Sequence, residues 1–434
     1  MDMIASTLRA SALVSDDACH ISREVFTSQQ VYQWEKQHIF GKNWLYLCHD
    51  SQIPKPGDFI TTYMGETPVI VARGADGNIH ANINSCAHRG LPVCRSDQGN
   101  TKRFVCPYHN WSYTVEGDLA ALPQERKVAC KPDKSKLGLN KVPRIDDYCG
   151  LVFGSFNPEI QNLDSYLGNM KFYLDTYFSR FPGGVEVIGA PHKWLLDANW
   201  KLPVENQLGD VGHGPFLHGT LLADTPAQEE IESYGFNTVP EPGHGAAVRY
   251  LPEDYPPELN AWGYEGISTA LNPEPELHEY LLDIQARVAD SLSPAHARVN
   301  GLTFGVYPNF SFLWSNSTIR VSHPRAPGKV EYWSWWVVPK EAPDHIKAIL
   351  QGNYTLMFGP GGLLEQEDSD AWMLQYKGSK LDYADKPYFY GLGAGEETTH
   401  PDLPGKVGSC YNEHYAREFY KRWRQDMENG GVQA

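Results

Sequence analysis

Two short clusters of cysteine and histidine, Cys86-Ala-His88 and Cys106-Pro-Tyr-His109, are separated by seventeen residues. Together they supply two thiolates and two imidazoles. This is the ligand set of a Rieske [2Fe–2S] cluster, in which the thiolates bind one iron and the histidines bind the other. Because neutral imidazoles replace two anionic thiolates, such a cluster has a higher reduction potential than an all-cysteine cluster. The spacing therefore indicates a redox protein that passes on single electrons.

A structural zinc site could use the same four side chains. Zinc fingers place both cysteines before both histidines, whereas here the order is Cys, His, Cys, His. The order and spacing favour the Rieske cluster over zinc, and they favour either metal site over four unrelated core residues.

A second polar group lies in residues 205–218, which are otherwise mostly glycine and apolar. Asp210, His213 and His218 are the residue types of a 2-His-1-carboxylate Fe(II) site, which leaves positions open for dioxygen and substrate. On a regular helix the two histidines would lie about 140° apart, but the Gly-Pro pair between them should interrupt the helix. Asp210 is either the third ligand or a partner that fixes a histidine tautomer. In the second case, a carboxylate of the acidic cluster 365–370 completes the site.

The composition limits the class of protein. A chain of 434 residues predicts two or three domains, and its net charge of -16 argues against nucleic-acid binding. Eight cysteines are too few for a disulfide scaffold and suit a reducing compartment. We find no apolar stretch of about 18 residues that could span a membrane, and residues 1–15 lack the apolar core of a signal peptide. We expect a cytoplasmic enzyme.

The secondary structure expected around these residues changes along the chain, from helix to short strands to a mixture of both. We therefore expect an α+β fold. The capping box Thr27-Ser-Gln-Gln30 predicts a helix to Ile39, so residues 1–39 are expected to form a helical arm that packs on the catalytic domain. Residues 40–160 are rich in short strands and should form the Rieske domain. Residues 161–434 should form the mononuclear iron domain, with helices flanking an antiparallel sheet.

Hydrophobic periodicity and turn residues predict particular elements. Strands are expected at 58–63, 68–73, 79–84, 310–314, 318–322 and 330–337. Helices are expected at 276–291, 343–357 and 413–429. Residues 229–272 are rich in proline and glycine, and they are expected to form a long loop that could cover a site.

With both constellations present, the chain resembles the large, catalytic subunit of the Rieske non-haem iron ring-hydroxylating oxygenases over nearly its whole length. Four segments are most similar to the benzoate and toluate dioxygenase branch, which acts on aromatic carboxylates. They are Gly41-Lys-Asn-Trp44, His49-Asp-Ser-Gln-Ile-Pro54, Cys86-Ala-His-Arg-Gly90 and Gln98-Gly-Asn100.

The resemblance implies a role for each residue of the two constellations. The implied cluster ligands are Cys86, His88, Cys106 and His109. The implied Fe(II) ligands are His213, His218 and Asp368. Asp210 matches the family's bridging aspartate, which hydrogen-bonds an iron-ligating histidine and a cluster histidine of the neighbouring subunit. Asn206 matches an asparagine near the open side of the iron.

Two positions depart from the family pattern. Asn110 follows His109 where glycine is usual, and asparagine tolerates the positive φ that a turn there would need. Val211-Gly212 precedes His213 where the family commonly carries a bulkier residue, so the space beside the iron should differ from that of benzoate dioxygenase. Six residues are candidates for the pocket wall. They are Gln207, Val211, Phe216, Phe312, Phe358 and Leu364.

The resemblance implies a terminal oxygenase component that receives electrons from NAD(P)H through a reductase, with or without a ferredoxin. It would add both atoms of O2 to an aromatic ring as a cis-dihydrodiol. The expected substrate is an aromatic carboxylate, either benzoate-like or an aryl-alkanoate, whose charge a cationic or amide side chain should bind. A small β subunit is expected to complete a trimer of heterodimers.

Three alternatives stay open. A monooxygenase of the same family, such as an aromatic-acid hydroxylase or a demethylase, would use the same iron ligands. A Rieske electron carrier without catalysis would not need residues 160–434 or the second histidine pair. A zinc-binding interaction module would be colourless.

Overall fold

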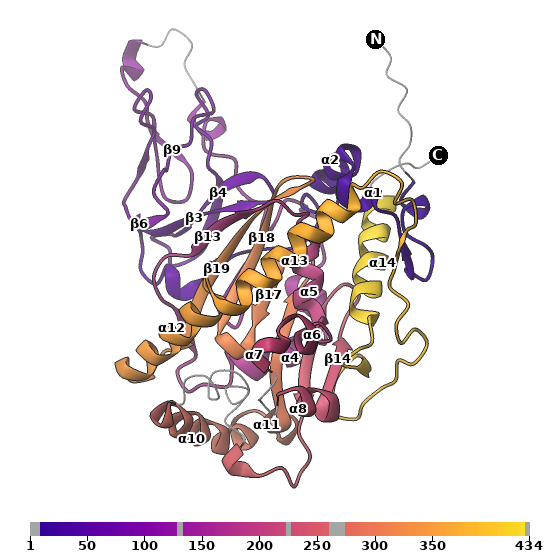
Figure 1. The fold of residues 1–434 in the computed structure, drawn as a ribbon. Helices are drawn as coiled ribbons and strands as arrows, with labels where there is room; N and C mark the ends of the chain where they lie inside the picture. The colour runs from indigo at the N-terminus through magenta and orange to yellow at the C-terminus, as the bar shows by residue number, and fades with distance from the viewer. Residues whose placement is uncertain (1–8, 128–132, 223–226, 260–273, 430–434) are drawn as a thin grey trace. The chain divides into compact units, whose positions relative to one another are not determined.

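The computed structural model describes residues 9–127, 133–222, 227–259 and 274–429 (Figure 1). The chain divides into two compact units. The smaller unit comprises Phe40–Asp164 and Glu186–Ala190, and the larger comprises Met1–Ile39, Ser165–Val185 and Pro191–Ala434. The N-terminal segment therefore belongs to the same unit as the C-terminal part of the chain.

The smaller unit is built from short antiparallel strands. They are β2 (Leu45–His49), β3 (Asp58–Met64), β4 (Thr67–Arg73), β5 (Ile79–Ile83), β6 (Gln98–Asn100), β7 (Phe104–Val105), β8 (Ser112–Tyr113), β9 (Leu119–Ala121), β10 (Arg144–Tyr148) and β11 (Leu151–Ser155). They form sheets in the orders β5-β4-β3-β6, β7-β8-β9 and β10-β11-β2. The predicted strands at 58–63, 68–73 and 79–84 are confirmed as β3, β4 and β5.

The core of this unit packs around the two motif cysteines. Cys86 and Cys106 are buried in one hydrophobic cluster with Phe59, Phe104 and Tyr113. Buried aromatic side chains exclude water from the sulfur atoms, and the dielectric around an iron–sulfur cluster is one of the factors that set its potential.

The larger unit is centred on an antiparallel sheet. Its strands follow the order β19-β18-β17-β16-β15-β14-β21, and β13 pairs with β19. The strands are β13 (His192–Leu196), β14 (Gly235–Val239), β15 (Gly245–Tyr250), β16 (Val299–Val306), β17 (Phe310–Leu313), β18 (Thr318–Ala326), β19 (Lys329–Pro339) and β21 (Lys406–Ser409). β1 (His20–Ile21) and β20 (Tyr388–Phe389) form a separate pair. The strands expected at 310–314, 318–322 and 330–337 are confirmed as β17, β18 and β19.

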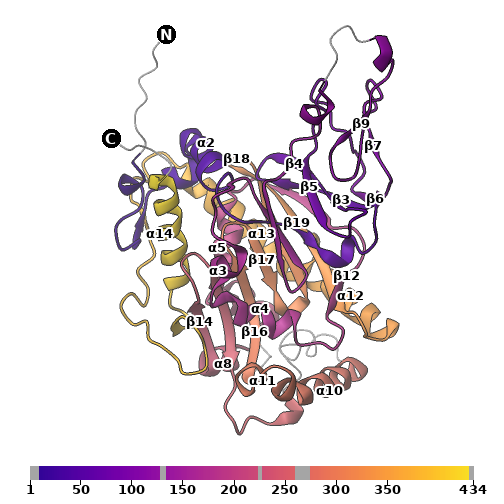
Figure 2. The same ribbon diagram turned by 180° about the vertical axis from the view of Figure 1, so that it is seen from behind.

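Helices flank this sheet, and in Figures 1 and 2 α12 and α13 lie along one face of its strands. The helices are α1 (Glu24–Thr27), α2 (Gln29–His38), α4 (Met170–Phe178), α5 (Lys201–Gly209), α6 (Gly214–Leu217), α7 (Gly219–Leu222), α8 (Ala227–Tyr234), α10 (Pro275–Ser291), α11 (Pro294–Arg298), α12 (Asp344–Phe358), α13 (Leu363–Ser379) and α14 (His414–Asn429). α3 (Leu163–Leu167) and β12 (Val185–Val187) lie at the unit boundaries in sequence. The predicted α+β class and the three predicted helices are confirmed.

The prediction of a long loop at 229–272 is wrong over the part of this segment that the structure describes. Residues 227–259 contain α8, β14 and β15 instead, and every residue of β15 is buried. The glycine and proline residues of this region mark a hairpin turn between β14 and β15, where Gly243 has a φ of +85°. Residues 260–273 lie outside the described part of the chain.

The N-terminal arm is anchored by a buried carboxylate on α2. Glu35 is fully buried and accepts hydrogen bonds from Lys201 Nζ at 2.5 Å, Trp423 Nε1 at 2.8 Å and Trp200 Nε1 at 2.9 Å. Glu35 thereby ties α2 to the start of α5 and to α14. The N-cap of α2 differs from the prediction by one residue, because Ser28 accepts from the Val31 N–H.

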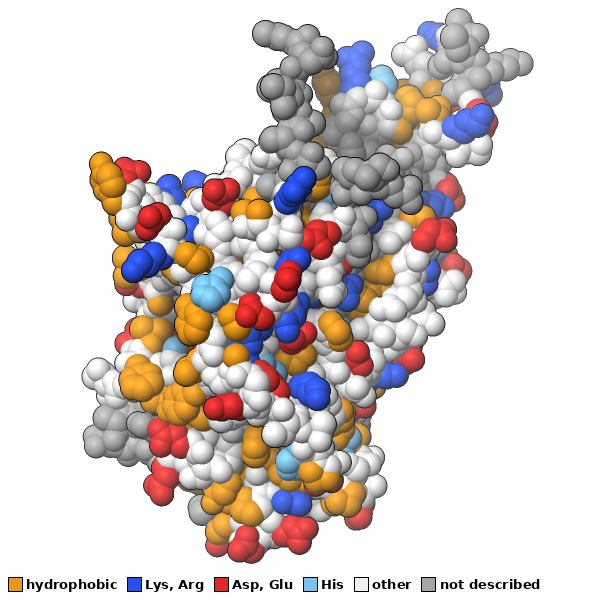
Figure 3. All heavy atoms as spheres, turned by 90° about the vertical axis from the view of Figure 1, so that its right-hand side faces the viewer, with side chains coloured by type: hydrophobic (Ala, Val, Ile, Leu, Met, Phe, Trp, Pro, Cys, Tyr) orange, Lys and Arg blue, Asp and Glu red, His pale blue; other side chains and the backbone are white. Residues whose placement is uncertain are grey.

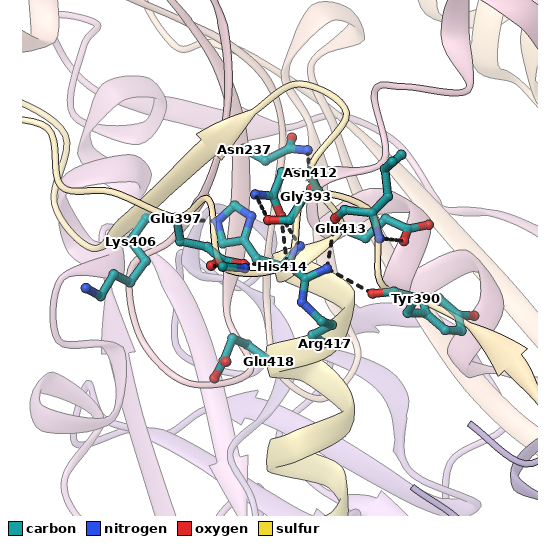
Figure 4. A network of polar contacts seen from close by, with 12 residues as sticks. Asn237, Tyr390, Gly393, Glu397, Lys406, Asn412, Glu413, His414, Arg417 and Glu418 are labelled. Atoms are coloured by element: carbon teal, nitrogen blue, oxygen red, sulfur yellow. Dashed lines mark hydrogen bonds and ion pairs between the residues drawn. The ribbon is translucent and has the colours of Figure 1, made fainter. Parts of the chain in front are cut away.

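A second polar network, shown in Figure 4, fixes the segment before α14. Arg417 Nη1 donates to the carbonyls of Tyr390 and Leu392, both at 2.9 Å. Its Nη2 donates to Asn412 Oδ1 at 2.8 Å and pairs with Glu397. One buried guanidinium therefore satisfies four acceptors from residues 390–412.

The surface carries charges of both signs. On the face drawn in Figure 3, acidic and basic side chains are interspersed. Among the helices of the described chain, we find none with the length and apolar content needed to cross a bilayer.

Candidate metal centres

Two matched turns carry the Cys-x-His and Cys-x-x-His motifs. In the first, the Gly90 N–H donates to the Cys86 carbonyl at 2.8 Å. In the second, the Asn110 N–H donates to the Cys106 carbonyl at 3.0 Å. Gly90 has a φ of +78° and Asn110 a φ of +60°. Asparagine is one of the few side chains that tolerate this conformation, so the prediction made for Asn110 is confirmed.

The four motif side chains differ in exposure and do not converge on one point. The cysteines are buried, whereas His88 and His109 are partly exposed, with ring centroids 4.6 Å apart. Within the described residues, only one group of three or more His, Cys, Asp or Glu brings its ligand atoms within 4.8 Å of one another, and it lies elsewhere. A tetrahedral zinc site needs such convergence. The wider arrangement fits a two-iron cluster better.

Tyr113 contributes a contact that the sequence analysis missed. Its hydroxyl lies 3.1 Å from Cys86 Sγ and accepts from the Ala87 N–H at 3.1 Å, so the hydroxyl proton is free to point at the sulfur. Burial and the neighbouring thiol raise the pKa of Tyr113, which therefore stays a donor. Hydrogen bonds to ligand sulfurs are one of the factors that set an iron–sulfur potential.

His213 and His218 flank a single helical turn. α5 ends at Gly209, and α6 lies between the two histidines, which are its N-cap and C-cap residues. Pro215 occupies the first turn of α6, where no N–H is needed for the helical ladder. The helix is therefore interrupted before His213, rather than at the Gly-Pro pair as predicted. This break turns both imidazoles toward the same point.

His213, His218 and Asp368 form the one convergent group, with all ligand atoms within 4.8 Å. Asp368 Oδ1 lies 3.3 Å from His213 Nε2 and 3.3 Å from His218 Nε2. This oxygen is buried and has no hydrogen-bond partner. An orphaned buried carboxylate oxygen between two imidazole nitrogens is what a divalent cation would satisfy, so these residues fit a 2-His-1-carboxylate metal site.

Electrostatics favour positive charge in this group. Burial acts to lower the pKa of His213, but Asp210 and Asp368 outweigh it and raise that pKa to about 10. Burial also acts to lower the pKa of His218, and Asp368 again raises it. Burial acts to raise the pKa of Asp368, and the two histidines lower it to about 2. An ionised Asp368 opposite positive charge is the state this geometry stabilises.

The outer ring nitrogens contact different partners. His213 Nδ1 lies 3.3 Å from Asn206 Nδ2 and 3.6 Å from Asp210 Oδ2. Asp210 therefore lies on the side of the ring away from Asp368, outside the convergent group. His218 Nδ1 lies 2.7 Å from Glu367 Oε2, a contact that the sequence analysis did not include.

A buried ion pair holds the helix that carries Asp368. Arg320 on β18 pairs with Glu365 on α13 at 2.7 Å, and both side chains are fully buried. Glu365 also accepts from Ser369 at 3.2 Å, and Arg320 reaches the Phe358 carbonyl at 3.4 Å. Breaking such a pair leaves an uncompensated buried charge, so it constrains the first turns of α13.

The candidate pocket residues divide by exposure. Gln207, Phe312, Phe358 and Leu364 are buried, and Val211 is partly exposed. Phe216 is 78% exposed, so its side chain points to solvent rather than into an enclosed pocket. Thr303 Oγ1 donates to the Gln207 carbonyl at 2.6 Å, which joins α5 to β16.

Comparisons with known proteins identify the families of both parts of the chain. Residues 43–132 match the Rieske [2Fe–2S] domain family, and residues 163–429 match the catalytic domain of the ring-hydroxylating alpha subunits. The two matches define a Rieske non-haem iron oxygenase, with a [2Fe–2S] cluster and a mononuclear iron as its cofactors.

The chain is similar along its whole length to named enzymes. It is 33% identical to the biphenyl dioxygenase alpha subunit of Metapseudomonas furukawaii, over 96% of this chain and 92% of the relative. It is 34% identical to the chlorobenzene dioxygenase alpha subunit of Cupriavidus sp. (strain PS12), over 96% and 93%. A naphthalene 1,2-dioxygenase structure with bound phenanthrene superimposes with a TM-score of 0.88 at 31% identity, over 98% and 96%.

The chain belongs to the family of ring-hydroxylating dioxygenase alpha subunits. These relatives are named for biphenyl, chlorobenzene and naphthalene, and none of the three for benzoate or toluate.

Proposed function

We propose that this alpha subunit dihydroxylates an uncharged aromatic ring, rather than the aromatic carboxylate expected from the resemblance to the benzoate branch. The proposal rests on the buried lysine and arginine side chains, which already have partners inside the protein. The buried lysine and arginine side chains of the described chain are Arg180, Lys201, Arg249, Arg320 and Arg417.

Each of these cations is already engaged inside the protein. Their respective side-chain partners are Gln285, Glu35, Glu230, Glu365 and Glu397. A carboxylate buried beside the iron would need a cation of its own, because an unpaired buried charge is strongly unfavourable. Four of these partners are carboxylates, and Arg180 donates to neutral oxygens of Thr176, Gln285, His296 and Val299. The engagement of these buried cations inside the described core supports a neutral ring.

The amides nearest the convergent group are also occupied. Gln207 Nε2 donates to Asn206 Oδ1 at 3.2 Å, and Asn206 Nδ2 contacts His213 Nδ1 at 3.3 Å. These contacts orient Asn206 toward the ligand histidine and engage one N–H of each amide. The candidate wall residues Phe312 and Phe358 are buried aromatic side chains, which would suit an apolar ring.

We assign the metals to the two groups of ligands. Residues 40–160 hold the cluster through Cys86, His88, Cys106 and His109, and residues 161–434 hold the mononuclear iron through His213, His218 and Asp368. When bound, the cluster supplies single electrons and the iron activates dioxygen. The protein itself orients the ring, excludes water and holds the ligand tautomers.

Asp210 is proposed to bridge to a cluster histidine of a neighbouring subunit. Its side chain is 37% exposed and lies 3.6 Å from His213 Nδ1, which supports a position at a subunit boundary. The relatives are named as alpha subunits, which supports a partner β subunit. The trimer of heterodimers remains what the family resemblance implies. A reductase, with or without a ferredoxin, would deliver the NAD(P)H electrons.

A substrate panel tests the charge of the substrate. Biphenyl, naphthalene and chlorobenzene are compared with benzoate, toluate and an aryl-alkanoate, using a reconstituted electron supply and identification of products by mass spectrometry. We expect kcat/KM for the best neutral ring to exceed that for the best carboxylate at least tenfold. A preference for any carboxylate would overturn the proposal.

A further inference from the structure

Two consecutive residues of α13 contact opposite nitrogens of one imidazole. Glu367 Oε2 lies 2.7 Å from His218 Nδ1, and Asp368 Oδ1 lies 3.3 Å from His218 Nε2. Adjacent residues of a helix point about 100° apart, so the two carboxylates reach around the ring from two sides. His218 is thereby held between them.

The two histidines of the group are not held equally. The outer nitrogen of His213 is 3.6 Å from Asp210, beyond hydrogen-bond distance. The outer nitrogen of His218 has a short contact with a carboxylate, and the His218 side chain is 93% buried. The geometry therefore fixes His218 tightly and leaves His213 with weaker outer contacts.

We propose that Glu367 is a positioning residue that holds His218 in its metal-binding tautomer. A neutral histidine that binds metal through Nε2 must carry its proton on Nδ1, and a carboxylate acceptor at 2.7 Å selects that tautomer and fixes the ring. The proposal rests on the assignment of His218 as an iron ligand.

The position of Glu367 is itself fixed by its helix. Glu365, two residues earlier, forms the buried ion pair with Arg320. Ser369, one turn after Glu365, donates a hydrogen bond to the Glu365 carboxylate. The backbone that carries Glu367 is therefore constrained from both sides. Because this backbone is already ordered, less conformational entropy is lost when the Glu367 carboxylate bonds to His218.

The test measures iron affinity rather than turnover. Chains with an intact cluster are stripped of mononuclear iron, and Fe(II) is titrated back against a competing chelator, with metal analysis as the readout. The visible absorption of the [2Fe–2S] cluster reports folded chain independently. We expect Glu367→Ala to weaken Fe(II) binding about 10- to 100-fold, the usual effect of losing such a partner.

Matched variants separate the hydrogen bond from charge and folding. Glu367→Gln keeps an oxygen acceptor and should retain most of the affinity. Asp370→Asn removes an exposed carboxylate from the same helix and should change nothing. Should Glu367→Ala fail to fold, Glu367→Asp decides, because its shorter side chain should weaken binding at least threefold.

The outcomes distinguish the role of Glu367 from the assignment of the iron ligands. Wild-type affinity in Glu367→Ala or, where that variant does not fold, in Glu367→Asp would overturn the role of Glu367. Equal losses in Asp370→Asn and Glu367→Ala would also overturn it, because the effect would then be one of charge. Failure of the wild-type protein to bind a third iron would instead overturn the assignment of His213, His218 and Asp368.

Discussion

At the scale of single residues, both metal centres combine side chains from short motifs with contacts from other segments of the chain. The cluster motifs and the His213/His218 pair are short patterns whose residue types indicate their chemistry directly. Tyr113 and Glu367 carry no such signal, because each acts through a contact with a residue from a different segment. Only the folded chain brings a phenol to Cys86 and a second carboxylate to His218.

Asp210 gives a prediction at this scale. Because it lies beside His213 Nδ1 and outside the convergent group, we expect Asp210→Ala to retain about three irons per chain and the spectrum of the cluster. Coupled turnover should fall at least 100-fold, because the proposed bridge between centres is lost. Iron analysis and NAD(P)H-driven product formation provide the two measurements, and normal turnover would remove Asp210 from the electron path.

At the scale of elements, the predicted strands are short runs rich in β-branched and aromatic residues, and they include β17, which is buried at every position. The prediction fails at 229–259, where glycine and proline belong to a hairpin and β15 is buried on both faces. β15 begins with Gly-Ala-Ala, residues of low strand propensity, so neither alternation nor a run of β-branched residues marks it in the sequence. The sequence does not indicate a helix at the acidic cluster 365–370 either. Glu365 and Asp368 are polar but buried, so the helix lacks the usual pattern of polar residues on its exposed side.

Glu205 on α5 gives a prediction about stability and pH. Burial raises its pKa to about 8, against hydrogen bonds from Tyr420 and Tyr390 that lower it. Its ordinary pKa is 4.5, so between these values the folded state binds more protons than the unfolded state. The contribution of Glu205 to stability is complete below its unfolded pKa and is lost as the pH rises through about 8.

The variant Glu205→Gln should remove this dependence while keeping polar contact with both tyrosines. Each unit of pKa shift corresponds to about 1.4 kcal/mol, so from pH 6 to 8 the wild type should lose roughly 2 kcal/mol relative to the variant. Thermal melts of the loaded protein should show the variant's Tm rising relative to wild type by a few degrees over this range. A Tm difference that does not change with pH would contradict the buried, protonated state of Glu205.

At the scale of the whole molecule, the two units are not continuous in sequence. Residues 1–39 lie in the larger unit, and 186–190 lie in the smaller one. The N-terminal arm is anchored by the fully buried pair of Glu35 and Lys201, between which the whole of the smaller unit lies in sequence. Such a pairing leaves no local pattern, whereas the presence of both an electron donor and an oxygen-activating site could be predicted from motifs alone.

In the proposed function, electrons that reach the cluster are used to add both atoms of O2 to one aromatic ring. The most direct measurement is product mass after turnover of a neutral ring, such as biphenyl, under ¹⁸O₂ in ordinary water. We expect a cis-dihydrodiol that carries two labelled oxygen atoms. A product with a single labelled oxygen would instead show a monooxygenase, and an unlabelled product would contradict any incorporation of O2 into the ring.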